Sequence, residues 1–129
     1  MSFMESTSRN RVYIVDDSAP IRARLVQMVE RGSGAQVVGE ASTARDAIAG
    51  IRETLPAAVV LDLNLLGPSG FEVLKAIHPQ HPAIVFIVLT NHAEPQYERA
   101  CRQQGASYFL DKTTQFDRVP EVLRTLAIQ

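Results

Sequence analysis

Residues 57–62 read Ala-Ala-Val-Val-Leu-Asp, an apolar run that ends in a carboxylate. Short uninterrupted apolar runs rich in β-branched residues are typical of strands covered on both faces of a parallel sheet. We therefore predict a central, buried strand over Ala57 to Leu61, with Asp62 at its carboxyl end.

Further apolar runs alternate along the chain with segments whose apolar residues recur at steps of three and four. The runs predict strands, and the periodic segments predict amphipathic helices bounded by capping residues, Pro and Gly. One helix carries Leu55 on its apolar stripe and ends at Pro56, and Asp117 is expected to cap the last helix. The predicted strands are Arg11 to Val15, Gln36 to Ala41, Ala57 to Leu61, Ala83 to Leu89 and Ser107 to Leu110, and the helices begin near Ser18, Thr43, Phe71, Glu94 and Asp117.

The order of these elements predicts an α/β fold. Five strands alternate with five helices, and each pair of parallel neighbours requires a right-handed helical crossover. We therefore expect a flavodoxin-like, doubly wound five-stranded parallel sheet with strand order 2-1-3-4-5 and helices on both faces.

Length and composition limit the domain organisation. With 129 residues, 46% of them hydrophobic and 21% charged, the chain is expected to form one globular domain over residues 11–129 after a flexible leader at residues 1–10. A formal net charge of −1 argues against direct nucleic acid binding. A lone cysteine, Cys101, and apolar runs too short to cross a bilayer predict a cytoplasmic protein with no membrane segment.

Polar side chains stand where the predicted strands end. Asp16 and Asp17 follow the first strand, Asp62 follows the third, Thr90 the fourth and Lys112 the fifth. Because the carboxyl ends of parallel strands share one edge of the sheet, we expect these side chains to converge in a single pocket.

The residue types in this pocket predict a hard cation and a phosphoryl group. Carboxylates gathered at short range repel one another unless a cation is bound, and Mg²⁺ prefers such oxygen ligands. Asp62 lies centrally and can attack phosphorus to form an acyl phosphate. The Lys112 ammonium and the Thr90 hydroxyl can stabilise the oxygens of the transferred group.

Taken in this order, the residues resemble the receiver domain of bacterial two-component response regulators. Each motif alone is weak, but their order and spacing together are highly specific. The resemblance covers Arg11 to Ile128 and includes Asp62-Leu63-Asn64-Leu65, Gly67, Gly70, Gly105-Ala106 and Phe109-Leu110-Asp111-Lys112.

The resemblance implies a role for each residue of the pocket. Asp62 would accept a phosphoryl group from a sensor histidine kinase or a phosphotransfer protein. Asp17 and Asp62 would hold Mg²⁺ directly, Asp16 would act through water, and the backbone carbonyl of Asn64 would complete the protein ligands. Such a domain is a signalling module with at most slow self-phosphorylation and self-dephosphorylation, not an enzyme.

The resemblance also implies a switch. Thr90 would move toward the phosphoryl group, and Phe109, in the position of the family's switch aromatic, would turn inward with it. The changed surface, made by the fourth helix, fifth strand and fifth helix, would contact a downstream effector protein or a second copy in a homodimer that forms on phosphorylation. No segment remains for an output module, so a stand-alone receiver is expected, although a fragment of a longer regulator would look the same.

Three positions depart from the family pattern. Leu66 stands where proline is frequent, which leaves the loop after Asp62 less restricted. Asn91 stands where a small residue is usual and is expected to narrow access to the pocket. Thr113 replaces a common proline, and a cis bond before a residue other than proline costs about 3 kcal/mol.

Three other classes of function fit these residues less well than a receiver domain. A phosphatase of the haloacid dehalogenase type needs a second aspartate two residues after the nucleophile, where this chain has Asn64. A flavodoxin-like cofactor binder needs a loop that accepts an anion after the first strand, where Asp16 and Asp17 would repel one. A degenerate receiver that acts only as a scaffold is disfavoured because every chemical position is filled.

Several conspicuous residues have simpler interpretations. His78 and His81 lie in a proline-broken loop and are not expected to form a zinc site without further ligands. Phe109 could be an ordinary core aromatic. Cys101 is expected to pack without chemical function.

Overall fold

The computed structural model describes residues 10–65 and 69–128. Five strands form one parallel sheet in the order β2-β1-β3-β4-β5, which confirms the predicted fold class and strand order. The strands are β1 (Arg11–Val15), β2 (Gln36–Ala41), β3 (Ala58–Leu61), β4 (Val85–Thr90) and β5 (Ala106–Asp111). Residues 1–9 of the leader predicted over residues 1–10, together with Leu66 and Gly67, lie outside the described residues.

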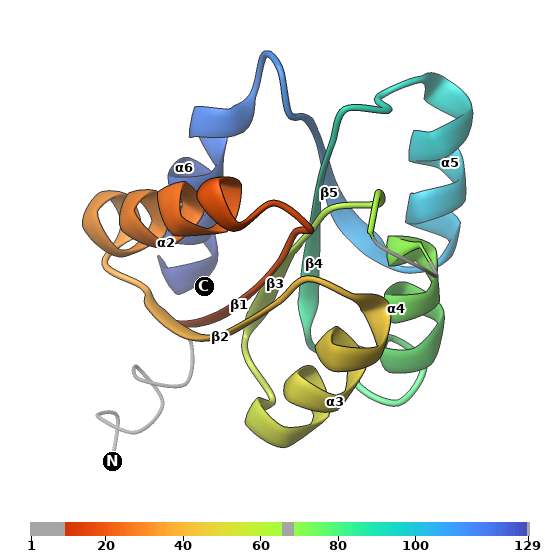
Figure 1. Ribbon diagram of the computed structural model, residues 1–129, viewed down its shortest axis with the longest axis horizontal. Coiled ribbons are helices and arrows are strands. Elements are labelled where there is room, and N and C mark those ends of the chain that lie inside the picture. Colours follow the sequence, from red (N-terminus) through yellow and green to blue (C-terminus); the bar gives the residue numbers. More distant parts are fainter. Residues whose placement is uncertain (1–9, 66–68, 129) are drawn as a thin grey trace.

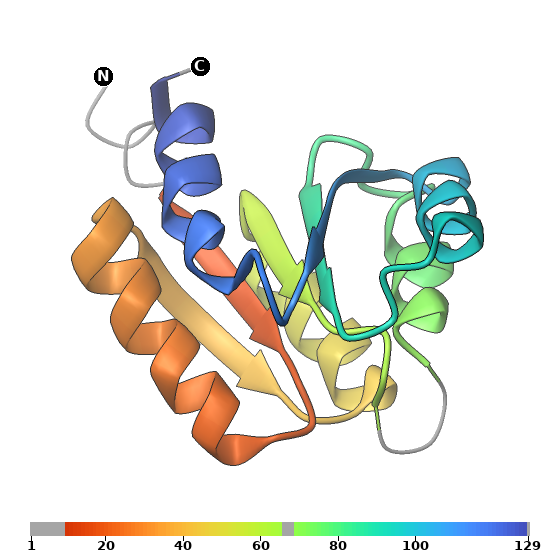
Figure 2. The ribbon, with the colours of Figure 1, turned by 90° about the horizontal axis from the view of Figure 1, so that it is seen from above.

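Helices cover both faces of the sheet (Figures 1 and 2). Helices α2 (Ala19–Ser33) and α6 (Val119–Ile128) pack against each other on one face. Helices α3 (Ala44–Thr54), α4 (Gly70–Ile77) and α5 (Pro95–Gln103) lie on the other, and a short 3-10 turn, η1 (Phe116–Arg118), precedes α6. None of the described helices combines the length and apolarity that crossing a bilayer requires.

The central strand β3 is buried along its whole length and separates two cores. Val59 and Leu61 belong to the core under α3, α4 and α5, whereas Ala58 and Val60 belong to the core under α2 and α6. Because successive side chains of a strand point to opposite faces, a strand between two cores must be apolar at every position. This is why the apolar run of β3 has no polar break.

The helix ends follow local sequence signals. Ser18 and Thr43 accept hydrogen bonds through their hydroxyls from Ile21 N (3.3 Å) and Asp46 N (3.1 Å), as N-cap residues do. Gly34 ends α2 in the left-handed conformation, with φ 73°.

Two sequence predictions were wrong at helix ends. Leu55 does not extend the apolar stripe of α3: it is the left-handed C-cap (φ 46°), half of its surface is exposed (50%), and Pro56 prevents the helix from continuing. Asp117 is not the N-cap of the last helix but lies inside η1, and α6 begins at Val119.

The strand boundaries also shift by one or two residues. Strand β4 begins at Val85 and not at Ala83, because Ile84 N donates to His81 O (3.1 Å) in the preceding turn. Strand β3 begins at Ala58, and β5 extends from Ala106 to Asp111, one residue beyond each predicted end.

Tyr13 fits the core only because two glycines lie beside it. Its ring, 4% exposed, packs against Gly39 of β2 and Gly50 of α3, and its hydroxyl donates to Glu40 O (3.3 Å). A Cβ atom at Gly50 would lie 2.6 Å from Tyr13 Cζ and still closer to the hydroxyl. A side chain at position 50 therefore cannot coexist with the tyrosine ring as it is placed.

We expect Gly50→Ala to destabilise the protein by about 1–3 kcal/mol through overpacking against Tyr13. Helix propensity alone predicts the opposite, a gain of about 1 kcal/mol for the same change. In a Tyr13→Val background the steric conflict is gone, so Gly50→Ala should then be stabilising. Urea unfolding of the wild type, the two single variants and the double variant measures the effect of Gly50→Ala in each background. A stabilising Gly50→Ala in the wild-type background would contradict the packing of Tyr13 against Gly50.

Cys101 should be chemically inert in the folded protein. The residue is fully buried in the core under α3, α4 and α5, and burial raises the pKa of its thiol to about 11. Because the thiolate is the reactive form, an aromatic disulfide reagent at pH 8 should react very slowly with the native protein and rapidly with one thiol per chain in denaturant. Equal rates in the two conditions would refute the buried placement.

Candidate functional site

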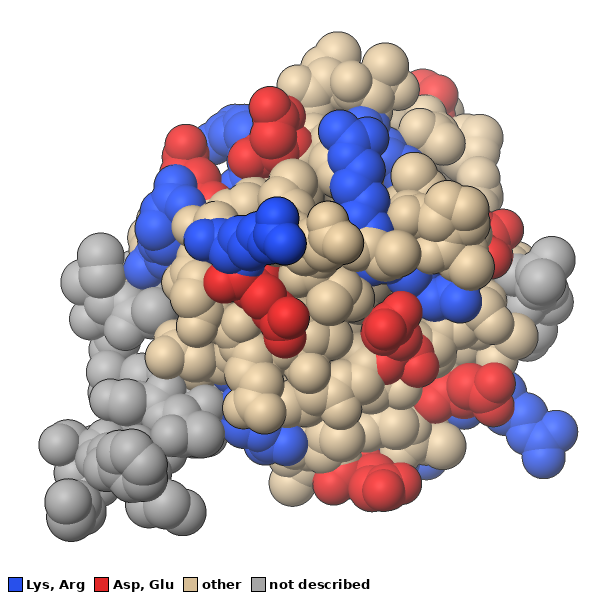
Figure 3. Space-filling model, turned by 60° about the vertical axis from the view of Figure 1, so that its left-hand side comes forward, with Lys and Arg blue, Asp and Glu red and all other residues tan. Residues whose placement is uncertain are grey.

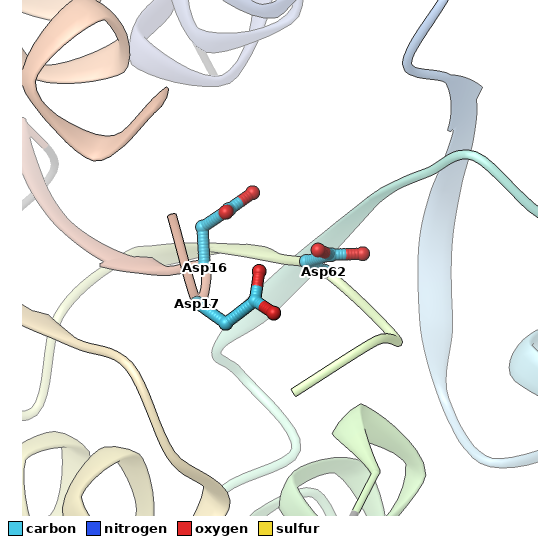
Figure 4. Close-up of side chains that lie close together, drawn as sticks. All are labelled: Asp16, Asp17 and Asp62. Carbon is cyan, nitrogen blue, oxygen red and sulfur yellow. The ribbon is translucent and has the colours of Figure 1, made fainter. Parts of the chain in front are cut away.

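Three carboxylates meet at the carboxyl edge of the sheet. Asp16 and Asp17 directly follow β1, and Asp62 directly follows the neighbouring strand β3. Figure 4 shows the three side chains gathered beside one another, and one ligand oxygen from each lies within 4.8 Å of the others. The structure thus brings together the carboxylates that the sequence predicted.

Lys112, directly after β5, bridges two of these carboxylates. Its Nζ lies 2.6 Å from Asp16 Oδ2 and 3.0 Å from Asp62 Oδ2. All three side chains are largely buried, with exposures of 11% for Lys112, 1% for Asp16 and 4% for Asp62. Asp17 differs, because it is exposed to solvent at the same edge.

The other oxygen of each buried carboxylate binds the backbone. Asp16 Oδ1 accepts a hydrogen bond from Ser18 N (2.9 Å), and Asp62 Oδ1 accepts one from Asn64 N (3.1 Å). Each carboxylate is therefore held at one oxygen by the loop that follows it and at the other by Lys112. This arrangement fixes both side chains without any further ligand.

The pKa values of Asp62 and Lys112 are both raised, but for different reasons. Desolvation raises the pKa of the Asp62 carboxyl, although the Lys112 ammonium and the Asn64 N–H act in the opposite direction. For Lys112, burial alone would favour the neutral amine, but the hydrogen bonds and charges of Asp16 and Asp62 together raise its pKa. The ammonium thus stays charged, and Asp62 is a carboxylate whose charge is only partly compensated.

Thr90 is the last residue of β4 and is fully buried. Its hydroxyl accepts a hydrogen bond from His92 N (3.1 Å), and its carbonyl accepts one from Lys112 N (2.8 Å). The backbone of Lys112 is thereby joined to the end of β4, but the Thr90 hydroxyl is engaged with its own loop.

A cavity of about 590 Å³ opens above the buried carboxylate Asp62. Asn91 contributes to its lining and Thr90 is not among the described lining residues, and the effect of Asn91 on access stays a prediction. The described lining residues are Asp17, Ser18, Ile21, Arg24, Asp62, Asn64, Asn91, Lys112, Thr113, Phe116 and Asp117.

The donor set fits a hard divalent cation. Asp16, Asp17 and Asp62 form the only group of three or more metal-ligating side chains of this closeness within the described residues. Mg²⁺ prefers carboxylate and carbonyl oxygens and retains several waters, which an open, exposed Asp17 and the adjoining cavity allow. Among these residues, His78 and His81 are not part of any such group.

Some positioning residues were missed by sequence reasoning. In the sequence, Gly70 is only one of the residues that carry the family resemblance, yet a Cβ atom there would lie 2.9 Å from Leu63 Cα and closer still to the backbone oxygen of Asp62. The absence of a side chain lets α4 pack directly on the loop after Asp62. The signal in the sequence is a glycine directly before the predicted helix start at Phe71.

The loop after β5 is held by a side chain whose role was also missed. Gln115 Oε1 accepts a hydrogen bond from Asp111 N (2.9 Å), and Asp111 Oδ1 accepts one from Thr113 N (2.8 Å). No cis peptide bond occurs in the described residues, so the Lys112–Thr113 bond is trans. These hydrogen bonds hold the backbone on both sides of Lys112. Thr113, which takes part in one of them, stands where the family commonly has proline.

Phe109 and Tyr108 point to opposite faces of β5. Phe109 is half-buried against the core under α3, α4 and α5, and Tyr108 is half-buried against the core under α2 and α6. The core contact of Phe109 agrees with its simpler interpretation, and its role as a switch stays a prediction.

Comparisons with known proteins show which family and which proteins this chain resembles. Residues 12–124 match the family described as the response regulator receiver domain. The chain is 30% identical over 115 residues to response regulator UvrY of Escherichia coli (strain K12), covering 89% of this chain and 53% of that protein. It is 28% identical over 114 residues to response regulator GacA of Pseudomonas protegens, covering 88% and 54%. The chain therefore spans about half the length of these curated relatives.

A solved structure is similar over most of both chains. The crystal structure of a two-component response regulator of the LuxR family from Aurantimonas sp. SI85-9A1 has a TM-score of 0.78 and 30% sequence identity. The similarity covers 89% of this chain and 85% of the other.

We expect Lys112→Met to lower the free energy of unfolding by about 3 kcal/mol, because it leaves two buried carboxylates without their cation. Mg²⁺ should recover part of this loss. Since the pKa of Lys112 is raised in the folded state, its contribution is present at neutral pH and is lost only as the pH rises through that value. Lys75→Met removes an exposed lysine paired with Glu72 and should cost less than about 1 kcal/mol. Equal losses for the two variants, measured by urea unfolding, would argue against the bridge.

Proposed function

The chain belongs to the response regulator receiver domain family, and from this membership we propose that residues 11–129 form a phosphoacceptor domain of a two-component phosphorelay. Its phosphodonor is a sensor histidine kinase or a phosphotransfer protein, and its acceptor is Asp62. The single observation that carries the proposal is the pairing of the buried Asp62 carboxylate with Lys112 at 3.0 Å, at the base of an open cavity.

The proposed reaction is a direct transfer to the carboxylate. An Asp62 oxygen attacks phosphorus and forms a new O–P bond, while the P–N bond of the donor phosphohistidine breaks and its electron pair stays on the imidazole nitrogen. Desolvation raises the pKa of Asp62, and a more basic carboxylate is a better nucleophile. The Lys112 ammonium, 3.0 Å from Asp62 Oδ2, would compensate the charge of the transferred oxygens once Asp62 is phosphorylated.

Mg²⁺ is the cofactor we propose. Asp17 and Asp62 would hold it directly, Asp16 through water, and the backbone carbonyl of Asn64 would be a further ligand. Bound there, the ion would supply positive charge against the carboxylates and the incoming phosphoryl group. The closeness of the three carboxylates, within 4.8 Å, supports this assignment.

The domain is proposed as a signalling module with at most slow self-phosphorylation and self-dephosphorylation. A phosphatase that turns over an aspartyl phosphate would need a further carboxylate near the nucleophile, at the position of Asn64. A turnover assay with small phosphomonoesters separates the two classes, because a receiver should release almost no phosphate catalytically.

The proposed output is a change of the α5-β5-α6 surface. To reach a phosphoryl group, the Thr90 hydroxyl would exchange its bond with His92 N for one to the new oxygens. Phe109 would then move further toward the core that it already contacts. The phosphorylated state is favoured only by the contacts it gains, so this is a shift between two conformations. We propose a downstream effector protein, or a second copy in a phosphorylation-dependent homodimer, as the partner of that surface.

The proposed setting is the cytoplasm, with neither direct nucleic acid binding nor membrane attachment by this domain. The net charge of −1 supports the first exclusion, and the buried free thiol of Cys101 agrees with a reducing compartment.

Incubation with acetyl phosphate and Mg²⁺ should add one phosphoryl group to the wild-type protein and none to Asp62→Ala, as read from intact mass. Asp46→Ala is the matched control, since Asp46 is an exposed carboxylate in the first turn of α3, and it should be modified like the wild type. An equal mass gain in Asp62→Ala and the wild type would defeat the assignment of Asp62.

A further inference from the structure

A second cationic side chain lines the cavity above Asp62. Of the residues described around this cavity, only Lys112 and Arg24 are cationic, whereas Asp17, Asp62 and Asp117 are anionic. Lys112 is engaged with Asp16 and Asp62 at the base. Arg24 is exposed and makes no ion pair within the described residues. Its positive charge can therefore interact with an anion that enters the cavity.

Arg24 is held in place by an aromatic ring and not by a carboxylate. Its Cζ lies 4.6 Å from the centroid of Phe116, the first residue of η1. Phe116 is itself only 8% exposed and belongs to the core under α2 and α6. A ring fixed in a core holds the guanidinium in a defined position and leaves its charge intact. A salt bridge would instead neutralise that charge.

Neither the net charge nor the face of the molecule in Figure 3 offers an approaching anion much attraction. The formal net charge is −1, and basic and acidic side chains are interspersed on the side of the molecule that Figure 3 shows, without a single-sign patch. The carboxylates of the cavity would repel an anion further. Besides Lys112 and the proposed Mg²⁺ at the base, Arg24 is the further cation that a phosphodonor would meet at this cavity.

We propose that Arg24, held over the Phe116 ring, captures the dianionic phosphoryl group of small acyl phosphates at the mouth of the cavity and so sets the donor preference of the site. This inference rests on the proposed function of Asp62. The planar guanidinium can donate two parallel hydrogen bonds to phosphoryl oxygens before transfer. In the transfer itself, an Asp62 oxygen forms the new O–P bond as the bond from phosphorus to the acyl oxygen breaks, and the carboxylate leaves with the electron pair.

Initial rates of Asp62 phosphorylation in Mg²⁺, followed by intact mass, test this role. Acetyl phosphate, a dianion at neutral pH, is compared with phosphoramidate, whose zwitterion carries one net negative charge. Arg24→Ala should lower the apparent second-order rate constant with acetyl phosphate roughly fivefold or more at low ionic strength, and clearly less with phosphoramidate. Added salt should bring the wild-type rate toward that of the variant.

Matched variants separate charge from packing. Arg24→Lys keeps the charge and should retain most of the rate, whereas Phe116→Leu keeps an apolar core residue but removes the ring and should lose part of it. Arg31→Ala changes an exposed arginine about two turns further along α2, outside the described cavity lining, and should react like the wild type.

The outcomes distinguish this inference from the proposed function. If the wild type accepts phosphate on Asp62 and Arg24→Ala reacts at the same rate, the role of Arg24 is refuted while the acceptor stands. The role is also refuted if Arg24→Ala slows both donors equally and added salt leaves the difference from the wild type unchanged, since the effect would then be structural. Failure of the wild type to be modified by either donor would instead overturn the proposed function itself.

Discussion

Two buried carboxylates share one ammonium at the centre of this molecule. Lys112 Nζ contacts both Asp16 and Asp62, and these residues come from the ends of β5, β1 and β3. Burial alone disfavours the charged forms of Asp62 and Lys112, and each charge is stabilised by the other. The strand order allows the contact, because β1 and β3 are neighbours and Lys112, which follows β5, reaches them past the end of β4.

Much of the fold was predictable because burial dictates the pattern of apolar residues. The run over Ala58 to Leu61 can only be a strand between two cores, and the polar side chains at the strand ends follow from parallel geometry. The errors lie where local signals compete: Leu55 has an apolar side chain at helical spacing, yet Pro56 after it ends the helix. Asp117 has the chemistry of a cap, but the chain makes a 3-10 turn there.

The finer parts of the site depend on contacts that no single sequence pattern encodes. The bond from Asp111 N to Gln115 Oε1 and the Arg24 contact with Phe116 join residues whose side chains could equally have faced solvent. Gly70 similarly appears as a loop residue until the backbone of Asp62 is seen against it. These contacts are set by how helices and loops pack on the sheet, which is decided by the whole core and not by neighbours in sequence.

The packing of Tyr13 against Gly39 and Gly50 also bears on how this chain could have diverged from its relatives. A tyrosine at that point of β1 is compatible with the present backbone only if both facing positions have no side chain. The three positions are therefore coupled in evolution. A smaller residue at position 13 must come first, and only then can alanine become acceptable at position 39 or 50. Among orthologues, the identities at these positions should covary, and mutational routes that begin at either glycine should be rare.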